Sequence, residues 1–123
     1  MIHLDTNFLI EALVPGSGAE AKTLGWLAAD EDLSISTIAW SEFLCGPLSA
    51  QDEVFARLLL PAPEPFVAVD AGRAAELFNR TGRRSRSLAD CQIAAVALRC
   101  GAQVATGNAA DFAPFQAQGL VLA

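Results

Sequence analysis

Short apolar segments alternate with longer segments of helical character along the whole chain, and this alternation constrains the fold more than any other feature. Strands are expected over 2–4, 33–36, 66–69 and 103–106, with 120–122 as a candidate fifth. Between them, apolar residues recur at helical spacing, so helices are expected over 6–14, 19–29, 37–44, 49–60, 71–81 and 87–100. Strands separated by helices need crossover connections, which produce a parallel sheet covered on both faces. We therefore expect an α/β fold, a three-layer α/β/α sandwich with a mainly parallel sheet of four to five strands.

The length and composition indicate one domain with a core of its own. The chain has 123 residues, of which 53% are hydrophobic, and its mean hydropathy is +0.37. A single domain over 1–123 is expected, and intrinsic disorder is excluded. No apolar run approaches the ~18–20 residues that cross a membrane, and no basic segment opens the chain as in a signal peptide, so the expected location is the cytoplasm. The three cysteines form no C-x-x-C pair, which argues against a zinc knuckle, and all three are interpreted as core residues.

The charges are distributed unevenly. The net charge is −6, which disfavours a protein that coats nucleic acid without specificity. Residues 73–99, however, hold six arginines against two acids, Glu76 and Asp90. One basic region on an acidic body fits a small site for an anionic ligand, although a solvated helix face explains the same pattern.

Four carboxylates lie near the carboxyl ends of the expected strands, where parallel sheets form their binding and catalytic sites. Asp5 ends the first expected strand, and Glu42 lies about one helical turn beyond the second. Asp90 opens the apolar helix before the fourth strand, and Asp111 follows that strand, just after Asn108. Carboxylates brought together in this way repel one another unless cations lie between them. Such hard oxygen ligands suit Mg²⁺ or Mn²⁺.

Each acid also has a purely structural explanation. Asp5 is placed to cap the helix that starts at Thr6. Ser87 and Asp90 fit the S-x-x-D pattern of a capping box. Glu42 is equally consistent with a solvated side chain, and Asp111 with the cap of a short turn. A cap and a metal ligand are not exclusive, because a capping carboxylate keeps a second oxygen.

Four short motifs resemble those of one family, the PIN-domain ribonucleases. They are, in chain order, Leu4-Asp5-Thr6-Asn7, Ser41-Glu42-Phe43, Ala89-Asp90-Cys91-Gln92-Ile93-Ala94-Ala95 and Thr106-Gly107-Asn108-Ala109-Ala110-Asp111-Phe112. Each motif is weak alone, but the four occur in order over nearly the whole chain. The length and compactness most resemble the VapC-type toxins of prokaryotic type II toxin–antitoxin pairs.

This resemblance implies an α/β/α sandwich and an endoribonuclease that depends on Mg²⁺ or Mn²⁺. It implies Asp5, Glu42 and Asp90 as metal-binding catalytic residues, joined by Asp111. Four polar residues would steady these ligands: Thr6, Asn7, Thr106 and Asn108. The resemblance also implies an RNA substrate, a cognate antitoxin protein and a homodimer. An ion held there would ease deprotonation of water and offset charge on the phosphoryl oxygens.

The last motif departs from the pattern. Asn108 stands where many family members have an acid, and Asp111 would supply charge three residues further on. Gly107 stands where a basic residue is common. Fewer charges would weaken a second metal, so the sequence leaves open one metal or two. It also leaves open a PIN relative that has lost most catalysis and serves as an RNA- or protein-binding module.

The loop over residues 82–86 contains three arginines, and a nuclease needs such cations to bind RNA. Arg83, Arg84 and Arg86 come just before Asp90, so we expect them to contact phosphates beside the scissile one. The single histidine, His3, lies inside the first strand and is interpreted as structural, which excludes a pair of acid–base histidines.

Other classes of protein fit less well. A haloacid-dehalogenase-like enzyme needs a second Asp two residues after the first, where this chain has Asn7. A receiver domain needs a late lysine, and the only lysine is Lys22. The segment 16–21 fits a glycine-rich nucleotide motif but follows a helix instead of a strand.

Overall fold

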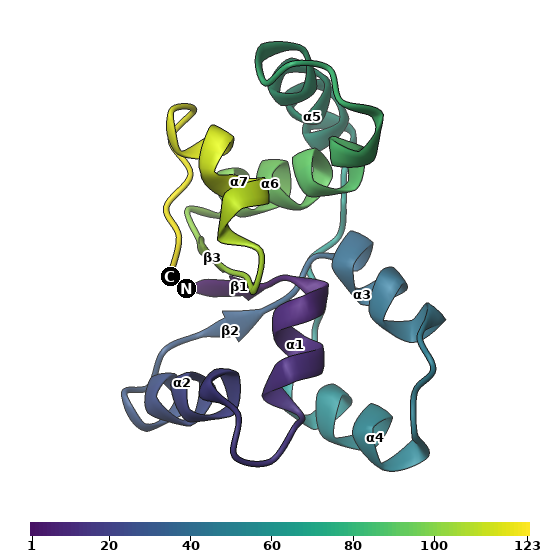
Figure 1. Cartoon of the computed structure of the whole chain (residues 1–123), viewed down its shortest axis with the longest axis vertical. Helices are drawn as coiled ribbons and strands as arrows, with labels where there is room; N and C mark the ends of the chain where they lie inside the picture. The colour runs from purple at the N-terminus through teal and green to yellow at the C-terminus, as the bar shows by residue number, and fades with distance from the viewer.

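The computed structural model describes residues 1–123, and a small parallel sheet lies at its centre (Figure 1). Its strands are β1 (Ile2–Leu4), β2 (Leu33–Ser34) and β3 (Gln103–Ala105), in the order β2-β1-β3. Both pairings are parallel, and Ile2 lies opposite Leu33 on one side and Gln103 on the other. The expectation of four to five strands was therefore wrong, since three are formed.

Seven α-helices surround this sheet: α1 (Thr6–Ala12), α2 (Gly18–Ala28), α3 (Thr37–Cys45), α4 (Ala50–Leu59), α5 (Ala68–Arg80), α6 (Leu88–Cys100) and α7 (Ala109–Gln116). A single 3₁₀ turn, η1 (Ser85–Ser87), precedes α6. Figure 1 shows α1 and α2 on one face of the sheet and α6 and α7 on the other, which is the predicted three-layer arrangement. None of the helices combines the length and apolar character needed to span a membrane.

The segment 66–69 was wrongly predicted to be a strand. α5 begins at Ala68, and the Asp70 carboxylate accepts a hydrogen bond from the Val67 N–H at 2.9 Å, which closes the first turn. Only Glu64 pairs with the sheet, by an isolated parallel bridge to Ser36. Prolines at 63 and 65 flank Glu64 and cannot donate to a ladder, so pairing stops there.

The candidate strand 120–122 is also reduced to one bridge. Leu122 pairs with Val104 at the outer edge of β3, where the Val104 N–H donates to the Val121 carbonyl at 2.9 Å and the Ala123 N–H donates to the Val104 carbonyl at 2.9 Å. The sheet thus has two edges, each extended by a single residue.

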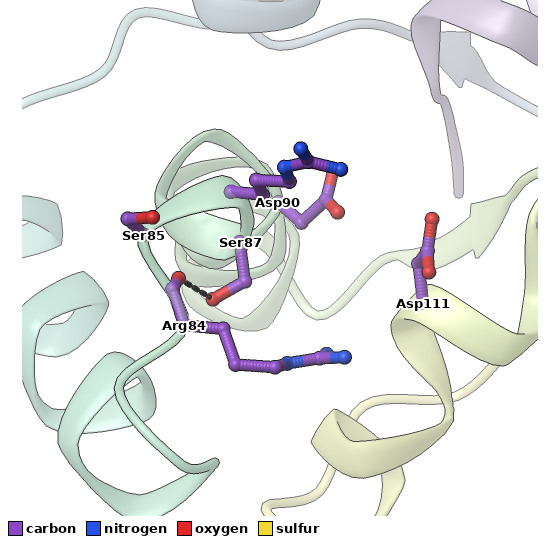
Figure 2. A pocket seen from close by; sticks show the side chains of 6 residues that line it. Arg84, Ser85, Ser87, Asp90 and Asp111 are labelled. Atoms are coloured by element: carbon purple, nitrogen blue, oxygen red, sulfur yellow. Dashed lines mark hydrogen bonds between the residues drawn. The ribbon is translucent and has the colours of Figure 1, made fainter.

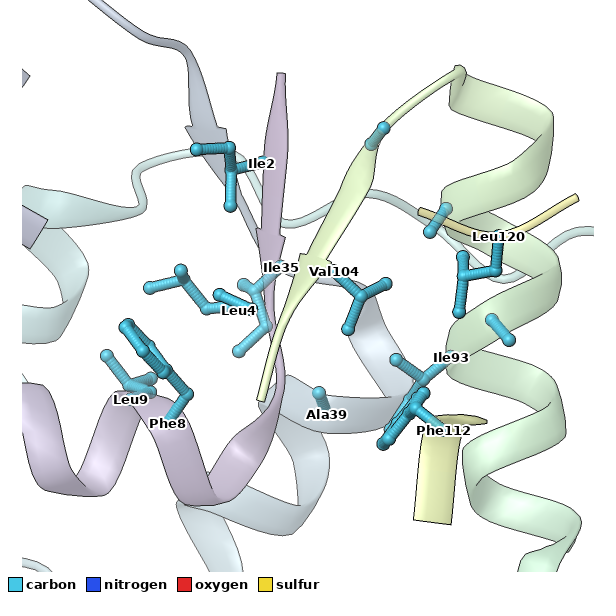
Figure 3. Close-up of a cluster of buried hydrophobic side chains, with 14 of the residues drawn as sticks. Ile2, Leu4, Phe8, Leu9, Ile35, Ala39, Ile93, Val104, Phe112 and Leu120 are labelled. Atoms are coloured by element: carbon cyan, nitrogen blue, oxygen red, sulfur yellow. The ribbon is translucent and has the colours of Figure 1, made fainter. Parts of the chain in front are cut away.

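The hydrophobic core fills both sides of the sheet, because successive strand side chains point to opposite faces. Leu4 packs with Phe8 and Leu9 of α1, whereas Val104 points to Ile93 and Phe112 on the opposite face (Figure 3). α6 is buried over most of its surface, including all of 93–97. This burial fixes the start of α6, and with it Asp90, relative to the end of β1. Of the three cysteines only Cys91 is buried; Cys45 is exposed at the end of α3, contrary to expectation.

Candidate active site

Asp5 lies where β1 ends and α1 begins. Its backbone N–H donates to the Ala105 carbonyl of β3 at 2.8 Å, the last step of the ladder. One carboxylate oxygen accepts from the Thr6 N–H at 2.8 Å and so caps α1, and the other accepts from the Thr106 hydroxyl at 2.9 Å. Burial raises the pKa of Asp5, the two hydrogen bonds oppose this rise, and the nearby charges of Glu42 and Asp111 add to it. Asp5 is therefore both a helix cap and an acid at the rim of the sheet.

Glu42 is brought to this rim by α3. The Thr6 hydroxyl is positioned between two acceptors, Glu42 Oε1 at 3.0 Å and the Ala39 carbonyl at 3.2 Å. Since Thr6 follows Asp5 directly, this contact ties the start of α1 to α3. The Glu42 side chain is otherwise exposed and remains open to a ligand.

Asp90 lies in the first turn of α6 and is half-buried. Its pKa is raised to about 6, first by burial and then by the negative charges of Asp5, Asp111 and Glu42, while Arg84 acts in the opposite direction. The capping box that the sequence allowed is not formed, because the Ser87 hydroxyl donates to the Arg84 carbonyl at 2.8 Å and no side chain caps α6. The Asp90 carboxylate is thus not used by the helix.

The last motif brings Asp111 near enough to Asp90 for its charge to raise the pKa of Asp90. Asn108 takes the cap position of α7, and its N–H donates to the Thr106 hydroxyl at 3.0 Å. Thr106 therefore links Asn108 to Asp5. Asp111 follows one turn later, in the first turn of α7. The side chain of Asn7 is exposed at the start of α1, and neither it nor that of Asn108 forms a hydrogen bond within the chain.

A pocket of 460 Å³ opens between these elements, and six residues line it: Arg84, Ser85, Arg86, Ser87, Asp90 and Asp111. Figure 2 shows Asp90 on α6 and Asp111 on α7 at different sides of the opening, and Arg84 extending into it from the loop. Ser85 was not singled out in the sequence; its position between two arginines shortly before Asp90 was the available signal.

The three loop arginines do not lie alike. Arg84 and Arg86 line the pocket, and neither forms an ion pair or a side-chain hydrogen bond within the chain. Arg83 instead donates to the Asn79 side chain and lies over the ring of Phe78 at 5.8 Å, so it is directed back onto α5. The positive φ of Arg83, 55°, turns the chain at this point.

The charges of Glu42 and Asp111 act on Asp5 and Asp90, yet the four carboxylates form no closed ligand set. No three side chains of His, Cys, Asp or Glu lie close enough to coordinate a single ion. The donor chemistry still fits a hard divalent cation, since Mg²⁺ keeps several waters and is commonly held by one or two carboxylates plus a substrate phosphate. The arrangement can therefore hold such a cation partly through water.

Comparison with known proteins shows the family of this chain. The family model described as PIN domain matches residues 2–114. The chain belongs to the PIN-domain family. The solved structure of FitAcB from Neisseria gonorrhoeae is 27% identical, with a TM-score of 0.73 over 100% of this chain and 97% of that one. The family membership expected from the four motifs is thus confirmed.

Two further PIN-fold structures share the architecture. VapBC2 from Rickettsia felis, solved bound to a DNA fragment from its promoter, is 22% identical with a TM-score of 0.73, covering 100% of this chain and 98% of that one. VapC20 from Mycobacterium tuberculosis, described as a toxin that cleaves the sarcin–ricin loop, is 22% identical with a TM-score of 0.67, covering 100% and 98%. At this identity the likeness shows the common fold.

Proposed function

We propose that this PIN-domain protein is an Mg²⁺- or Mn²⁺-dependent endoribonuclease and the toxin of a toxin–antitoxin pair. One observation carries the proposal: Arg84 and Arg86 line the same pocket as Asp90 and Asp111, yet these opposite charges do not pair. Unpaired groups of both signs in one pocket match a ligand that carries both signs itself. A phosphodiester accompanied by a divalent cation is such a ligand.

In this proposal the carboxylates bind the ion and the hydroxyls orient the carboxylates. Asp5, Glu42 and Asp90 would hold the ion, directly or through water, and Asp111 would add charge from α7. Thr6 and Thr106 orient Glu42 and Asp5 through the hydrogen bonds described above. Asn7 and Asn108 lie at the edge of the group and are proposed to bind the solvent around it.

Hydrolysis itself exchanges one bond to phosphorus for another. The oxygen of a water molecule bonds to phosphorus as the bond to the ribose oxygen breaks, and one proton of that water ends on the departing oxygen. When bound, the cation supplies Lewis acidity toward water and the phosphoryl oxygens. Arg84 and Arg86 hold the phosphate backbone in the pocket, and Arg83, directed onto α5, is proposed to contribute only at longer range.

A cleavage assay on a mixed RNA pool tests this proposal. We expect cleavage with Mg²⁺ or Mn²⁺ and none with EDTA. Asp5→Asn, which keeps the shape of the side chain, should reduce cleavage by at least about a hundredfold. Asp32→Asn, at an exposed acid before β2, is the matched control and should leave cleavage unchanged. Cleavage that survives EDTA or Asp5→Asn would show that the activity comes from elsewhere.

A second candidate function is a weakly catalytic or binding-only PIN module for RNA or protein. The incomplete ligand set and Asn108 favour it. RNA retention without metal-dependent cleavage would decide for this alternative.

The antitoxin would dock at the C-terminal end of α1, away from Asp5 at its start. A groove of 690 Å³ runs between α1, α2 and α4, and its apolar side chains include Leu13, Leu24, Leu27, Phe55 and Leu59. Leu24 and Phe55 are 59% and 54% exposed, which suits an amphipathic helix of a partner. Leu24→Asp should weaken inhibition by the product of the neighbouring gene without changing cleavage.

The homodimer expected from the resemblance remains a prediction, which sedimentation analysis measures.

A further inference from the structure

We propose that Glu11 is a specificity-determining residue that repels the RNA backbone on the α1 side of the acids, an inference that rests on the proposed function. Glu11 lies in the last turn of α1, and its side chain is exposed. Its carboxylate accepts no hydrogen bond and forms no ion pair within the chain, whereas its backbone carbonyl accepts from the Ser17 hydroxyl. An unpaired negative charge therefore lies on this helix.

Gly107 brings this carboxylate to the edge of the site. A Cβ atom at residue 107 would lie 3.8 Å from one carboxylate oxygen of Glu11 and 3.9 Å from the other. Gly107 stands between Thr106, whose hydroxyl donates to Asp5, and Asn108, whose N–H donates to that hydroxyl. The Glu11 carboxylate thus lies against the segment that holds Asp5 in place.

The backbone does not require glycine at this position. Gly107 is exposed and is not among the glycines with a positive φ, and an added Cβ would meet Glu11 at ordinary contact distance. A side chain is therefore tolerated at residue 107, and a basic one would pair with Glu11. The glycine leaves the charge of Glu11 without a neutralising partner.

Charges of opposite sign therefore flank the acids of the site. α1 and α6 cover opposite faces of the sheet (Figure 1), so Glu11 approaches from one face and Arg84 and Arg86 approach from the other. Glu11 is not among the charges that raise the pKa of Asp5 or of Asp90, so it lies outside the group proposed to hold the cation. A cation bound by that group leaves the charge of Glu11 in place.

The RNA backbone meets these charges on either side of the scissile phosphate. A phosphate on the arginine side gains charge-assisted hydrogen bonds, whereas a phosphate on the α1 side approaches an unpaired carboxylate. Two like charges about 7 Å apart in water weaken binding about threefold. The RNA is therefore held by its phosphates on one side of the scissile bond and repelled on the other.

Neutralising one phosphate at a time tests the inference. A cleavage site is mapped in the RNA pool, and oligonucleotides of that sequence are made with an uncharged methylphosphonate at each phosphate beside the scissile one. On one side we expect neutralisation to lower kcat/KM by about tenfold or more, because contacts with the arginines are lost. On the other side we expect it to raise kcat/KM about threefold, because the repulsion is removed.

Variants of Glu11 and Gly107 assign this gain to its cause. Glu11→Gln and Gly107→Arg should both abolish it, since the first removes the repelling charge and the second neutralises it with a guanidinium. Gly107→Ala adds a side chain without charge and should keep the gain. Asp32→Asn changes the net charge as Glu11→Gln does, but at an exposed acid by the opposite end of β1, and should behave as the parent.

The outcomes separate this inference from the proposed function. RNA cleavage in which no neutralised phosphate raises kcat/KM overturns the role of Glu11 and leaves the nuclease in place. A gain that persists in Glu11→Gln does the same, because its cause then lies elsewhere. Failure to cleave any RNA with Mg²⁺ or Mn²⁺ overturns both.

Discussion

Of the four carboxylates at the site, Asp90 is the one whose pKa the folded structure raises most clearly. Its pKa rises from 3.8 to about 6 on folding, so the folded protein holds this proton more tightly than the unfolded chain does. Stability contributed by the protonated form is therefore complete below pH 4 and is lost as the pH rises toward 6.

Asp90→Asn should accordingly stabilise the metal-free protein. At pH 7 we expect the free energy of unfolding to rise by ~1–2 kcal/mol, less than the ~3 kcal/mol equivalent to the whole rise in pKa, because solvent screens a half-buried carboxylate. Urea unfolding in EDTA at pH 7 and pH 4 measures this, and the gain should vanish at pH 4. Cleavage should be lost in the same variant. Lower stability at pH 7 with cleavage retained would mean that Asp90 serves the helix.

Metal affinity should depend on pH for the same reason. A carboxylate must lose its proton before it binds a cation, so protonation of Asp90 competes with Mn²⁺ below pH 6. We expect the apparent Kd for Mn²⁺ to weaken by up to about tenfold per pH unit below 6 and to be nearly constant above 7. Calorimetry in two buffers of different ionisation heat would count the released proton. An affinity that stays flat from pH 5 to 7 would remove Asp90 from the ligand set.

The positions of the acids were predictable and the orientation of the arginines was not. The rule that sites form beyond strand ends pointed to Asp5, Glu42, Asp90 and Asp111, and the charges of the other acids do raise the pKa of Asp5 and of Asp90. From the sequence, Arg83 and Arg84 were expected to have the same role, because both come just before Asp90. In the structure Arg83 is directed away from the pocket by its left-handed backbone conformation and by its contact with the Phe78 ring, and no sequence pattern predicts either feature.

At the scale of elements, the wrong strand at 66–69 has a specific cause. Four apolar residues in a row fit a short strand or the start of a helix equally well. Asp70 decides between them: its carboxylate is 1% exposed and accepts from the Val67 N–H at 2.9 Å and from Arg99 Nε at 2.8 Å. Arg99 also donates to Glu64 and to the Pro65 carbonyl, so the charge network holds the connector against α6.

Asp70→Ala should therefore destabilise the fold. It removes the acceptor of the Val67 N–H and the buried partner of Arg99, and we expect a loss of ~2–3 kcal/mol in the free energy of unfolding. Asp70→Asn keeps an acceptor for the cap and should lose less. Glu31→Gln, at an exposed ion pair with the N-terminus, is the control and should stay within ~0.5 kcal/mol. A denaturation midpoint unchanged by Asp70→Ala would show that the network adds nothing to stability.

At the scale of the molecule, the layer order and family followed from alternation and four motifs, but the width of the sheet did not. Strand number depends on whether edge segments pair, and prolines 63 and 65 limit one edge to Glu64. The folded structure leaves only part of the basic region over 73–99 unpaired. Of the six arginines in 73–99, four have partners within the chain, and two remain free at the pocket.

Because only two arginines of this region are unpaired, we expect RNA binding to depend weakly on salt. A ligand that meets two arginines on a body of net charge −6 should release about two counterions, which gives a slope near −1.4 for log affinity against log salt on a single strand. KM measured from 50 to 300 mM KCl at fixed Mg²⁺ gives this slope, and Arg84→Gln with Arg86→Gln should bring it close to zero. A slope steeper than about −4 would require about six or more phosphate contacts, and hence a basic surface that this monomer does not present. Such a result would place part of the RNA site on a second subunit, because the acidic remainder of the chain repels every further phosphate.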